Sequence, residues 1–232
     1  MAAIVFDLDG TLVDSAPDIA AAANRMLAEW GAAPLPLATI TRFIGNGIPH
    51  LVRLARQERD IPASEEARMK ERMLALYTAH PADLTRPYPG VVEALERLGL
   101  AGHVLGVCTN KFRAPSVQIL EALDLARFFK VVIGGDSLRV KKPDPAPLAA
   151  AFNALSGDTA LYVGDSEIDA EAARAADCPF ALFTRGYRKA PVDTLPHDIA
   201  FDDHAMLPAL VAARPGWPNR QARCRPRGNG SP

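Results

Sequence analysis

Short apolar runs rich in β-branched or aromatic residues recur along this chain. They cover residues 4–6, 104–108, 131–133, 160–163, 180–183 and, more weakly, 199–201. Between most of them lie stretches with apolar residues at helical spacing, at 91–98, 114–123, 147–155 and 169–176. Buried parallel strands are typically continuous apolar runs, and their alternation with helices places helices on both faces of the sheet. We therefore predict an α/β fold built on a parallel sheet.

One interval breaks this alternation. From Ser15 to Tyr88 the sequence shows no convincing strand, only apolar residues at a spacing that predicts three or four helices. A crossover between parallel strands needs only about a dozen residues, so an inserted helical domain is the simpler account. We predict a core from residues 1–14 and 90–213, a helical insert over residues 15–89, and a mobile tail rich in Pro, Gly and Arg over 214–232. The hinges are expected near Ser15 and at 87–90.

The first helix of the insert has a recognisable start. Ser15 is the predicted N-cap, with Pro17 in the first turn and Asp18 three residues after the cap. Apolar stripes follow on this helix and near the end of the insert, and we interpret both as packing faces rather than binding surfaces. These stripes are Ile19, Ala23, Met26, Leu27 and Trp30, and then Met69, Met73, Leu76 and Tyr77.

Composition and charge narrow the classes of partner. The 232 residues include 26 Lys and Arg against 27 Asp and Glu, a net charge of −1, which gives no basic field for nucleic acid or an anionic membrane. Three cysteines and five histidines show neither disulfide nor zinc spacing, and no apolar run is long enough to span a membrane. We expect a cytoplasmic monomer or homodimer without nucleic-acid or membrane partners.

Polar residues follow several of the predicted strands. Ligands of open parallel sheets bind at the carboxyl ends of the strands, so these residues are expected to meet at one edge. Two carboxylates directly after a buried strand are costly unless they bind a cation or carry out chemistry. The residues are Asp7 and Asp9, Thr109-Asn110-Lys111, Lys142, and Gly164-Asp165-Ser166 with Asp169 one helical turn later.

Four segments resemble, in order and spacing, the motifs of the haloacid dehalogenase superfamily of aspartate-nucleophile phosphohydrolases. They are Phe-Asp-Leu-Asp-Gly-Thr-Leu-Val-Asp-Ser from Phe6, Cys-Thr-Asn-Lys from Cys108, Lys-Lys-Pro-Asp-Pro from Lys141 and Val-Gly-Asp-Ser-Glu-Ile-Asp from Val163. Within it, Thr-Asn-Lys, Lys-Pro-Asp-Pro-Ala-Pro-Leu and Ile-Gly-Asn-Gly look most like bacterial phosphoglycolate phosphatases. The resemblance implies a Rossmann-like core with a helical cap and hydrolysis of a small phosphorylated metabolite, 2-phosphoglycolate first.

The resemblance also implies catalytic roles. Asp7 would be the nucleophile that forms an aspartyl phosphate, and Asp9 the general acid and then the base on water. Lys142 would offset charge on the nucleophile and the phosphoryl group, while Thr109 and Asn110 would donate hydrogen bonds to phosphate oxygens.

A magnesium ion is the implied cofactor. Mg²⁺ prefers oxygen ligands and commonly bridges one or two carboxylates to a phosphate. The Asp7 carboxylate, the Asp9 main-chain carbonyl and the Asp165 carboxylate would supply its protein ligands. Asp169 would orient this shell from outside.

The insert is expected to contribute substrate contacts. Gly45, Asn46 and Gly47 either form an ordinary turn between helices or a loop that closes over the substrate and reads its non-phosphate end. For a carboxylate at that end, the nearby cationic candidates are Arg42, His50 and Arg53.

Other functions stay open on the sequence alone. The core motifs do not exclude a phosphatase of nucleotides, sugar phosphates or pyrophosphate. A mutase similar to β-phosphoglucomutase would share the nucleophile, acid and cap, although Thr109-Asn110 resembles the phosphatase pattern. A non-catalytic phosphate-binding protein is disfavoured by the presence of Asp7, Asp9, Lys142 and Asp165 together.

Overall fold

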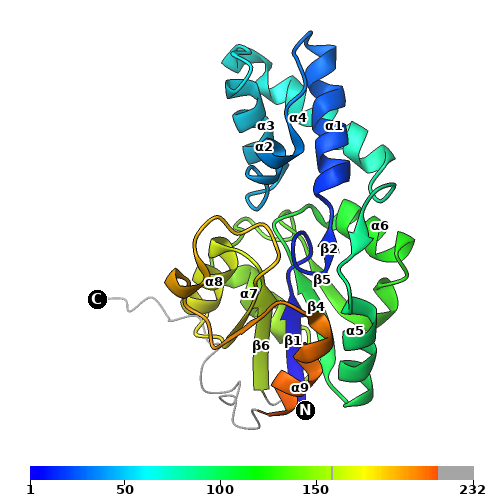
Figure 1. The fold of residues 1–232 in the computed structure, drawn as a ribbon, viewed down its shortest axis with the longest axis vertical. Helices are drawn as coiled ribbons and strands as arrows, with labels where there is room; N and C mark the ends of the chain where they lie inside the picture. Colours follow the sequence, from blue (N-terminus) through cyan, green and yellow to red (C-terminus); the bar gives the residue numbers. More distant parts are fainter. Residues whose placement is uncertain (158, 214–232) are drawn as a thin grey trace.

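A computed structural model describes residues 1–157 and 159–213 (Figure 1). Its main sheet has the strand order β5-β4-β1-β6-β7-β8, and every neighbouring pair is parallel. The strands are β1 (Ala2–Phe6), β4 (Val104–Cys108), β5 (Phe129–Ile133), β6 (Thr159–Gly164), β7 (Phe180–Phe183) and β8 (Ile199–Phe201). Each predicted apolar run lies in one of them, which confirms the α/β fold.

Helices cover both faces of this sheet because successive side chains of a strand point to opposite sides. Ile4 and Phe6 of β1 pack toward α5 (Val91–Leu100), α6 (Arg113–Ala122) and α9 (Leu207–Ala212). Ala3 and Val5 pack toward α7 (Ala146–Asn153) and α8 (Glu167–Ala175). The central strand is therefore buried on both sides, as its unbroken apolar sequence predicted.

The helical insert lies beyond the carboxyl ends of the strands (Figure 1). It contains α1 (Ala16–Glu29), α2 (Leu37–Thr41), α3 (Ile48–Gln57) and α4 (Glu66–Ala79), with a 3-10 turn at Ala63–Glu65. Both predicted apolar stripes are mostly buried, and they join the same core as one face of the sheet. Their burial supports the packing interpretation for most of these residues, while Ile19, Met73 and Tyr77 also line a cavity beside Asp7 and Asp9.

The two linkers to the insert pair with each other. β2 (Val13–Asp14) and β3 (Arg86–Pro87) form a short antiparallel ribbon, with Val13 opposite Pro87 and Asp14 opposite Arg86. The prediction of no strand between Ser15 and Tyr88 is therefore wrong at Arg86–Pro87. A strand of two residues carries no periodicity, so sequence patterning does not reveal it.

The start of α1 differs from the predicted cap. The helix begins after Ser15, but the Ser15 hydroxyl donates to Asp9 Oδ1 at 2.6 Å and makes no capping bond. The Tyr187 hydroxyl accepts from the Ser15 and Ala16 amides at 2.8 and 3.0 Å instead. Asp18 accepts the amides of Leu84 and Thr85, so it ties the returning linker to the helix.

A buried histidine lies under the hinge. The His204 ring is 1% exposed and packs against Phe183 and Phe201, with ring centroids 4.3 and 5.3 Å away. Neither ring nitrogen has a hydrogen-bond partner among the described residues. Burial lowers the pKa of His204 to about 4, because desolvation outweighs the nearby Asp203 carboxylate.

This histidine should make the protein less stable in acid. As pH falls below about 6.5, unfolded chains bind a proton that the native His204 does not, so stability is lost between about pH 6.5 and 4. We expect His204→Phe to reduce the drop in unfolding free energy between pH 7.5 and 5.0 by about 2 kcal/mol. Urea unfolding at both pH values measures it. The exposed His80→Phe variant is the control, and equal drops in all three proteins would contradict the assignment.

No helix in the described ranges is both long and apolar enough to cross a membrane. The predicted tail over residues 214–232 lies outside the described residues.

Candidate active site

The strand ends gather the predicted polar residues. Asp7 directly follows β1, Thr109 follows β4 and Asp165 follows β6, while Lys142 comes from the loop between β5 and α7. All of them are buried, at 8%, 4%, 1% and 1% exposure respectively. The convergence that the sequence predicted is therefore present at this edge of the sheet.

Lys142 is the central cation of this edge. Its ammonium lies 3.0 Å from Asp7 Oδ1 and donates to Asp169 Oδ1 and the Tyr162 hydroxyl, each at 2.7 Å. Burial alone would lower the pKa of Lys142, but the charges of Asp169 and Asp7 raise it above its usual range. Lys142 is thus a fixed positive charge beside the Asp7 carboxylate.

Asp169 completes a hydrogen-bonded network with this lysine. It accepts from Lys142, from the Tyr162 hydroxyl at 2.6 Å and from the Ser166 hydroxyl at 2.6 Å, within a capping box at the start of α8. Burial opposes its ionisation, yet Lys142 and the hydroxyl donors hold the pKa of Asp169 below its usual range. Tyr162 is a member of the site that no sequence motif indicated.

Three carboxylates form a site that fits a divalent cation. Asp7, Asp165 and Asp169 each offer an oxygen, and these oxygens lie within 4.8 Å of one another. Burial raises the pKa of Asp7 to about 7, and burial with the charges of Asp169 and Asp7 raises that of Asp165 well above its usual range. A cation shared by Asp7 and Asp165 would relieve this cost, and an all-oxygen donor set suits Mg²⁺.

Asp9 forms an ion pair with Lys111, a residue of the second motif to which the motif alone assigns no role. Lys111 Nζ lies 2.8 Å from both carboxylate oxygens of Asp9, and its side chain is 5% exposed. Burial disfavours the charge, but the Asp9 carboxylate raises the pKa of Lys111 above its usual range. The partners are 102 residues apart in sequence, so no local pattern signals the pair.

Asn110 has a different set of contacts from those expected. Its amide nitrogen donates to the main-chain oxygens of Gly45 and Lys142, both at 3.0 Å. Both amide hydrogens are therefore used within the protein rather than aimed at a phosphate. Thr109 Oγ1 accepts from the Lys111 amide at 3.3 Å and keeps its proton for donation.

The loop at 45–47 touches the core directly. Gly45 accepts from Asn110, and Asn46 O accepts from Lys141 Nζ at 2.6 Å. Gly47 has φ +79, and a Cβ there would lie 2.9 Å from Asn110 O, so only glycine fits this close approach. The insert therefore closes onto the second motif through main-chain atoms.

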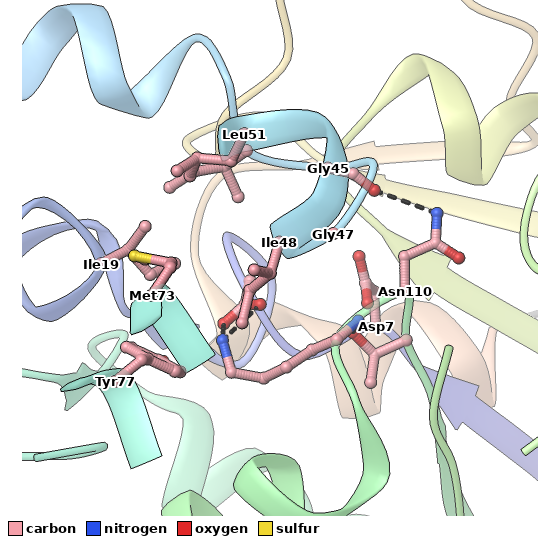
Figure 2. A pocket seen from close by; sticks show the side chains of 13 residues that line it. Asp7, Ile19, Gly45, Gly47, Ile48, Leu51, Met73, Tyr77 and Asn110 are labelled. Carbon is pink, nitrogen blue, oxygen red and sulfur yellow. Dashed lines mark hydrogen bonds and ion pairs between the residues drawn. The ribbon is translucent and has the colours of Figure 1, made fainter. Parts of the chain in front are cut away.

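Two cavities meet at Asp7 and Asp9. A larger one of about 530 Å³ borders Asp165 and Tyr187, and a smaller one of about 50 Å³ lies under the insert. Figure 2 shows Asp7 and Asn110 on the core side of the smaller cavity, facing apolar side chains of the insert. The residues Arg42, His50 and Arg53 line neither cavity; Arg53 instead contacts His50 at 2.8 Å.

The fold and the site define an α/β enzyme whose buried acidic centre lies under a helical insert. The sequence profile of haloacid dehalogenase-like hydrolases matches residues 4–183. The chain therefore belongs to this hydrolase family, which confirms the resemblance seen in its motifs.

Individual relatives match over almost the whole chain. A phosphoglycolate phosphatase of Cereibacter sphaeroides is 52% identical over 213 residues, covering 91% of this chain and 98% of that protein. One of Rhodobacter capsulatus is 42% identical over 219 residues, covering 93% and 97%. The crystal structure of a predicted phosphoglycolate phosphatase from Haemophilus somnus is 32% identical with a TM-score of 0.83, covering 90% of this chain and 96% of that one.

Proposed function

We propose that this protein is a Mg²⁺-dependent phosphatase that hydrolyses 2-phosphoglycolate to glycolate and phosphate. The observation that supports it most directly is the Asp7 carboxylate, buried 3.0 Å from the Lys142 ammonium at the end of the first strand. The substrate is suggested by relatives named phosphoglycolate phosphatase, which match this chain over most of its length.

In this proposal Asp7 attacks the phosphorus in line, and the bond from phosphorus to the glycolate oxygen breaks. Asp9 is ion-paired with Lys111 in the free protein, so it takes up a proton when the substrate binds and gives that proton to the leaving oxygen. It then removes a proton from the water that attacks the aspartyl phosphate. That second step releases phosphate and regenerates the Asp7 carboxylate. Splitting the reaction in this way matters because phosphate monoester hydrolysis is among the slowest uncatalysed reactions.

The neighbouring residues stabilise the charge that moves. Lys142 offsets negative charge on Asp7 and the phosphoryl group, and the Thr109 hydroxyl donates to a phosphate oxygen. Asn110 holds the Gly45 carbonyl and thereby the insert over the site. Closure of the loop at 45–47 excludes bulk water, which strengthens each of these interactions.

Mg²⁺ would be held by the carboxylates of Asp7 and Asp165 and the main-chain oxygen of Asp9. When bound, the cation neutralises charge on the carboxylates and the phosphate oxygens. Thr11 and the Tyr187 amide already fix the Asp165 carboxylate, at 2.7 and 2.6 Å, so one ligand is positioned in advance. Asp169 acts from outside this shell, because the Lys142 ammonium lies 2.7 Å from its Oδ1 and would repel a cation bound there.

Initial rates of phosphate release on a substrate panel test this function. With Mg²⁺, we expect kcat/KM for 2-phosphoglycolate to exceed that for glucose phosphates, nucleoside monophosphates and pyrophosphate at least tenfold, or about 1.4 kcal/mol of selective transition-state binding. A flat profile would indicate a generalist phosphatase. Absence of release from every substrate would instead favour a mutase or a non-catalytic protein.

A chelation arm of the same experiment tests the cofactor. EDTA should abolish phosphate release because Asp7 and Asp165 would then face the phosphate uncompensated, and excess Mg²⁺ should restore it. Full activity in chelator would refute the metal assignment while leaving the substrate preference measurable.

A further inference from the structure

The smaller cavity has two very different walls. Its insert side is formed by apolar side chains, and Tyr77 is the one polar side chain that the insert contributes there (Figure 2). These apolar residues are Ile19, Ile44, Ile48, Leu51 and Met73. An anion enclosed by such a wall loses its hydration and must find a charged partner elsewhere.

The core side of the cavity offers one cation. Among the described residues that line it, Lys111 is the only one with a positive charge; the cationic candidates of the insert are outside. Its ammonium has three donors; Asp9 takes two of them, and the Tyr77 side chain is the other close neighbour of this ammonium. The Tyr77 ring lies 4.5 Å from this nitrogen, on the cavity side of the insert.

A second polar atom at the same place lacks a partner. The Tyr77 side chain is 1% exposed, and its hydroxyl makes no hydrogen bond of good geometry with any other described residue; the charge that acts on it most strongly is the neighbouring Lys111 ammonium. Leaving a buried hydroxyl unsatisfied costs about 1–3 kcal/mol, so this group is suited to a ligand atom that accepts a hydrogen bond. A cation and a free donor together match a carboxylate.

The size of the cavity fits a short acid. Since about 10–15 Å³ of such space holds one water, the volume of about 50 Å³ has room for three to five non-hydrogen atoms. The part of 2-phosphoglycolate beyond its ester oxygen has a methylene and a carboxylate, which fall within that range. A sugar ring or a nucleoside does not fit there.

We propose that Lys111, assisted by the Tyr77 hydroxyl, binds the substrate carboxylate and is the main specificity-determining residue of this enzyme. The inference rests on the proposed function, and it places recognition of the carboxylate on the strand end after β4 rather than on basic residues of the insert. The insert supplies the apolar wall and the hydroxyl that isolate the charge pair.

A matched pair of substrates separates this role from the support that Lys111 gives to Asp9. 2-Hydroxyethyl phosphate has the length of 2-phosphoglycolate and no carboxylate. We expect Lys111→Met to lower the ratio of their kcat/KM values, 2-phosphoglycolate over 2-hydroxyethyl phosphate, about hundredfold. An equal decrease in kcat/KM for both substrates would instead reflect the loss of the contact by which Lys111 positions Asp9. Lys111→Arg should recover part of the ratio, and the exposed Lys130→Met should leave it unchanged.

Tyr77→Phe is the second variant, because it removes only the hydroxyl and leaves the ion pair between Lys111 and Asp9 in place. We expect it to lower the same ratio about twentyfold, within the usual range for one hydrogen bond to a charged group. Equal proportional losses on both substrates in Lys111→Met, together with an unchanged ratio in Tyr77→Phe, would overturn the proposal.

Binding provides a readout that does not require turnover. In an Asp7→Asn background, calorimetry should show that Lys111→Met weakens binding of 2-phosphoglycolate at least tenfold and leaves 2-hydroxyethyl phosphate within about twofold. Failure of the proposed function appears in the wild-type protein, as absent preference for 2-phosphoglycolate on the panel. The present inference fails if the wild type prefers 2-phosphoglycolate and the Lys111→Met variant keeps that preference. It also fails if the wild type binds 2-phosphoglycolate and 2-hydroxyethyl phosphate with equal affinity.

Discussion

Asp7→Asn is expected to lower kcat for phosphate release about 10⁴-fold or more, since an amide cannot form the aspartyl phosphate and the remaining groups have no nucleophile to assist. The substitution changes one atom and keeps an acceptor oxygen near Lys142. Burial raises the pKa of Asp7 to about 7, so the carboxylate is costly to ionise in the native protein. The protein therefore loses stability as the pH rises from the ordinary pKa of an aspartate through about 7.

Stability measurements distinguish a chemical defect from a folding defect in this variant. Because asparagine has no charge to bury, we expect its unfolding free energy at pH 8 to equal or exceed that of the wild type. Urea unfolding followed by circular dichroism, alongside single-turnover kinetics, makes both comparisons. Turnover within tenfold of the wild type would show that another residue is the nucleophile.

Lys142→Met is expected to have the largest effect on stability. It leaves the carboxylates of Asp7 and Asp169 buried without their shared cation, and breaking a buried pair by removal of one partner costs about 3–5 kcal/mol. It should also lower kcat/KM by about 10²–10³, the effect of removing one fixed donor from a developing charge. Urea unfolding at pH 7.5 and rates on 2-phosphoglycolate measure the two effects.

The adjacent lysine provides the control. Lys141 is exposed and its ammonium contacts Asn46 O, so Lys141→Met should cost less than about 1 kcal/mol of stability. The stability gap between Lys142→Met and wild type should narrow as pH falls toward 5, because the buried carboxylates that have lost Lys142 then take up protons. If Lys142→Met were as stable as the wild type at pH 7.5, the carboxylates of Asp7 and Asp169 would not both be ionised in the variant.

The fold was predictable because its central strands are buried on both faces. Strands such as β4 and β7 are continuous apolar runs between helical stretches, and their predicted bounds agree with the structure. The β2–β3 ribbon was not predictable, since pairing of Val13 with Pro87 depends on the insert bringing distant residues together. The pattern of apolar residues in a sequence indicates which residues of one helix or strand are buried, but it does not indicate which other element they contact.

The site shows the same division. The positions of Asp7 and Asp165 followed from the rule that parallel strands end at a common edge. Ser15 fits a local capping signature, but its hydroxyl has a stronger acceptor in the Asp9 carboxylate. Lys111 and Tyr77 come from the core and the insert, so their meeting at one cavity depends on how the insert is seated. No sequence window contains that information.

The β2–β3 ribbon also sets how easily the site opens and closes. Because the two short linkers pair with each other, the insert can adopt few orientations relative to the core. The loop at 45–47 is therefore held near Asn110 at a high effective concentration. Closure then needs little binding energy beyond the hydrogen bonds to Gly45 and Asn46. Correspondingly little has to be given up when product leaves, so we expect closure of the insert not to slow product release.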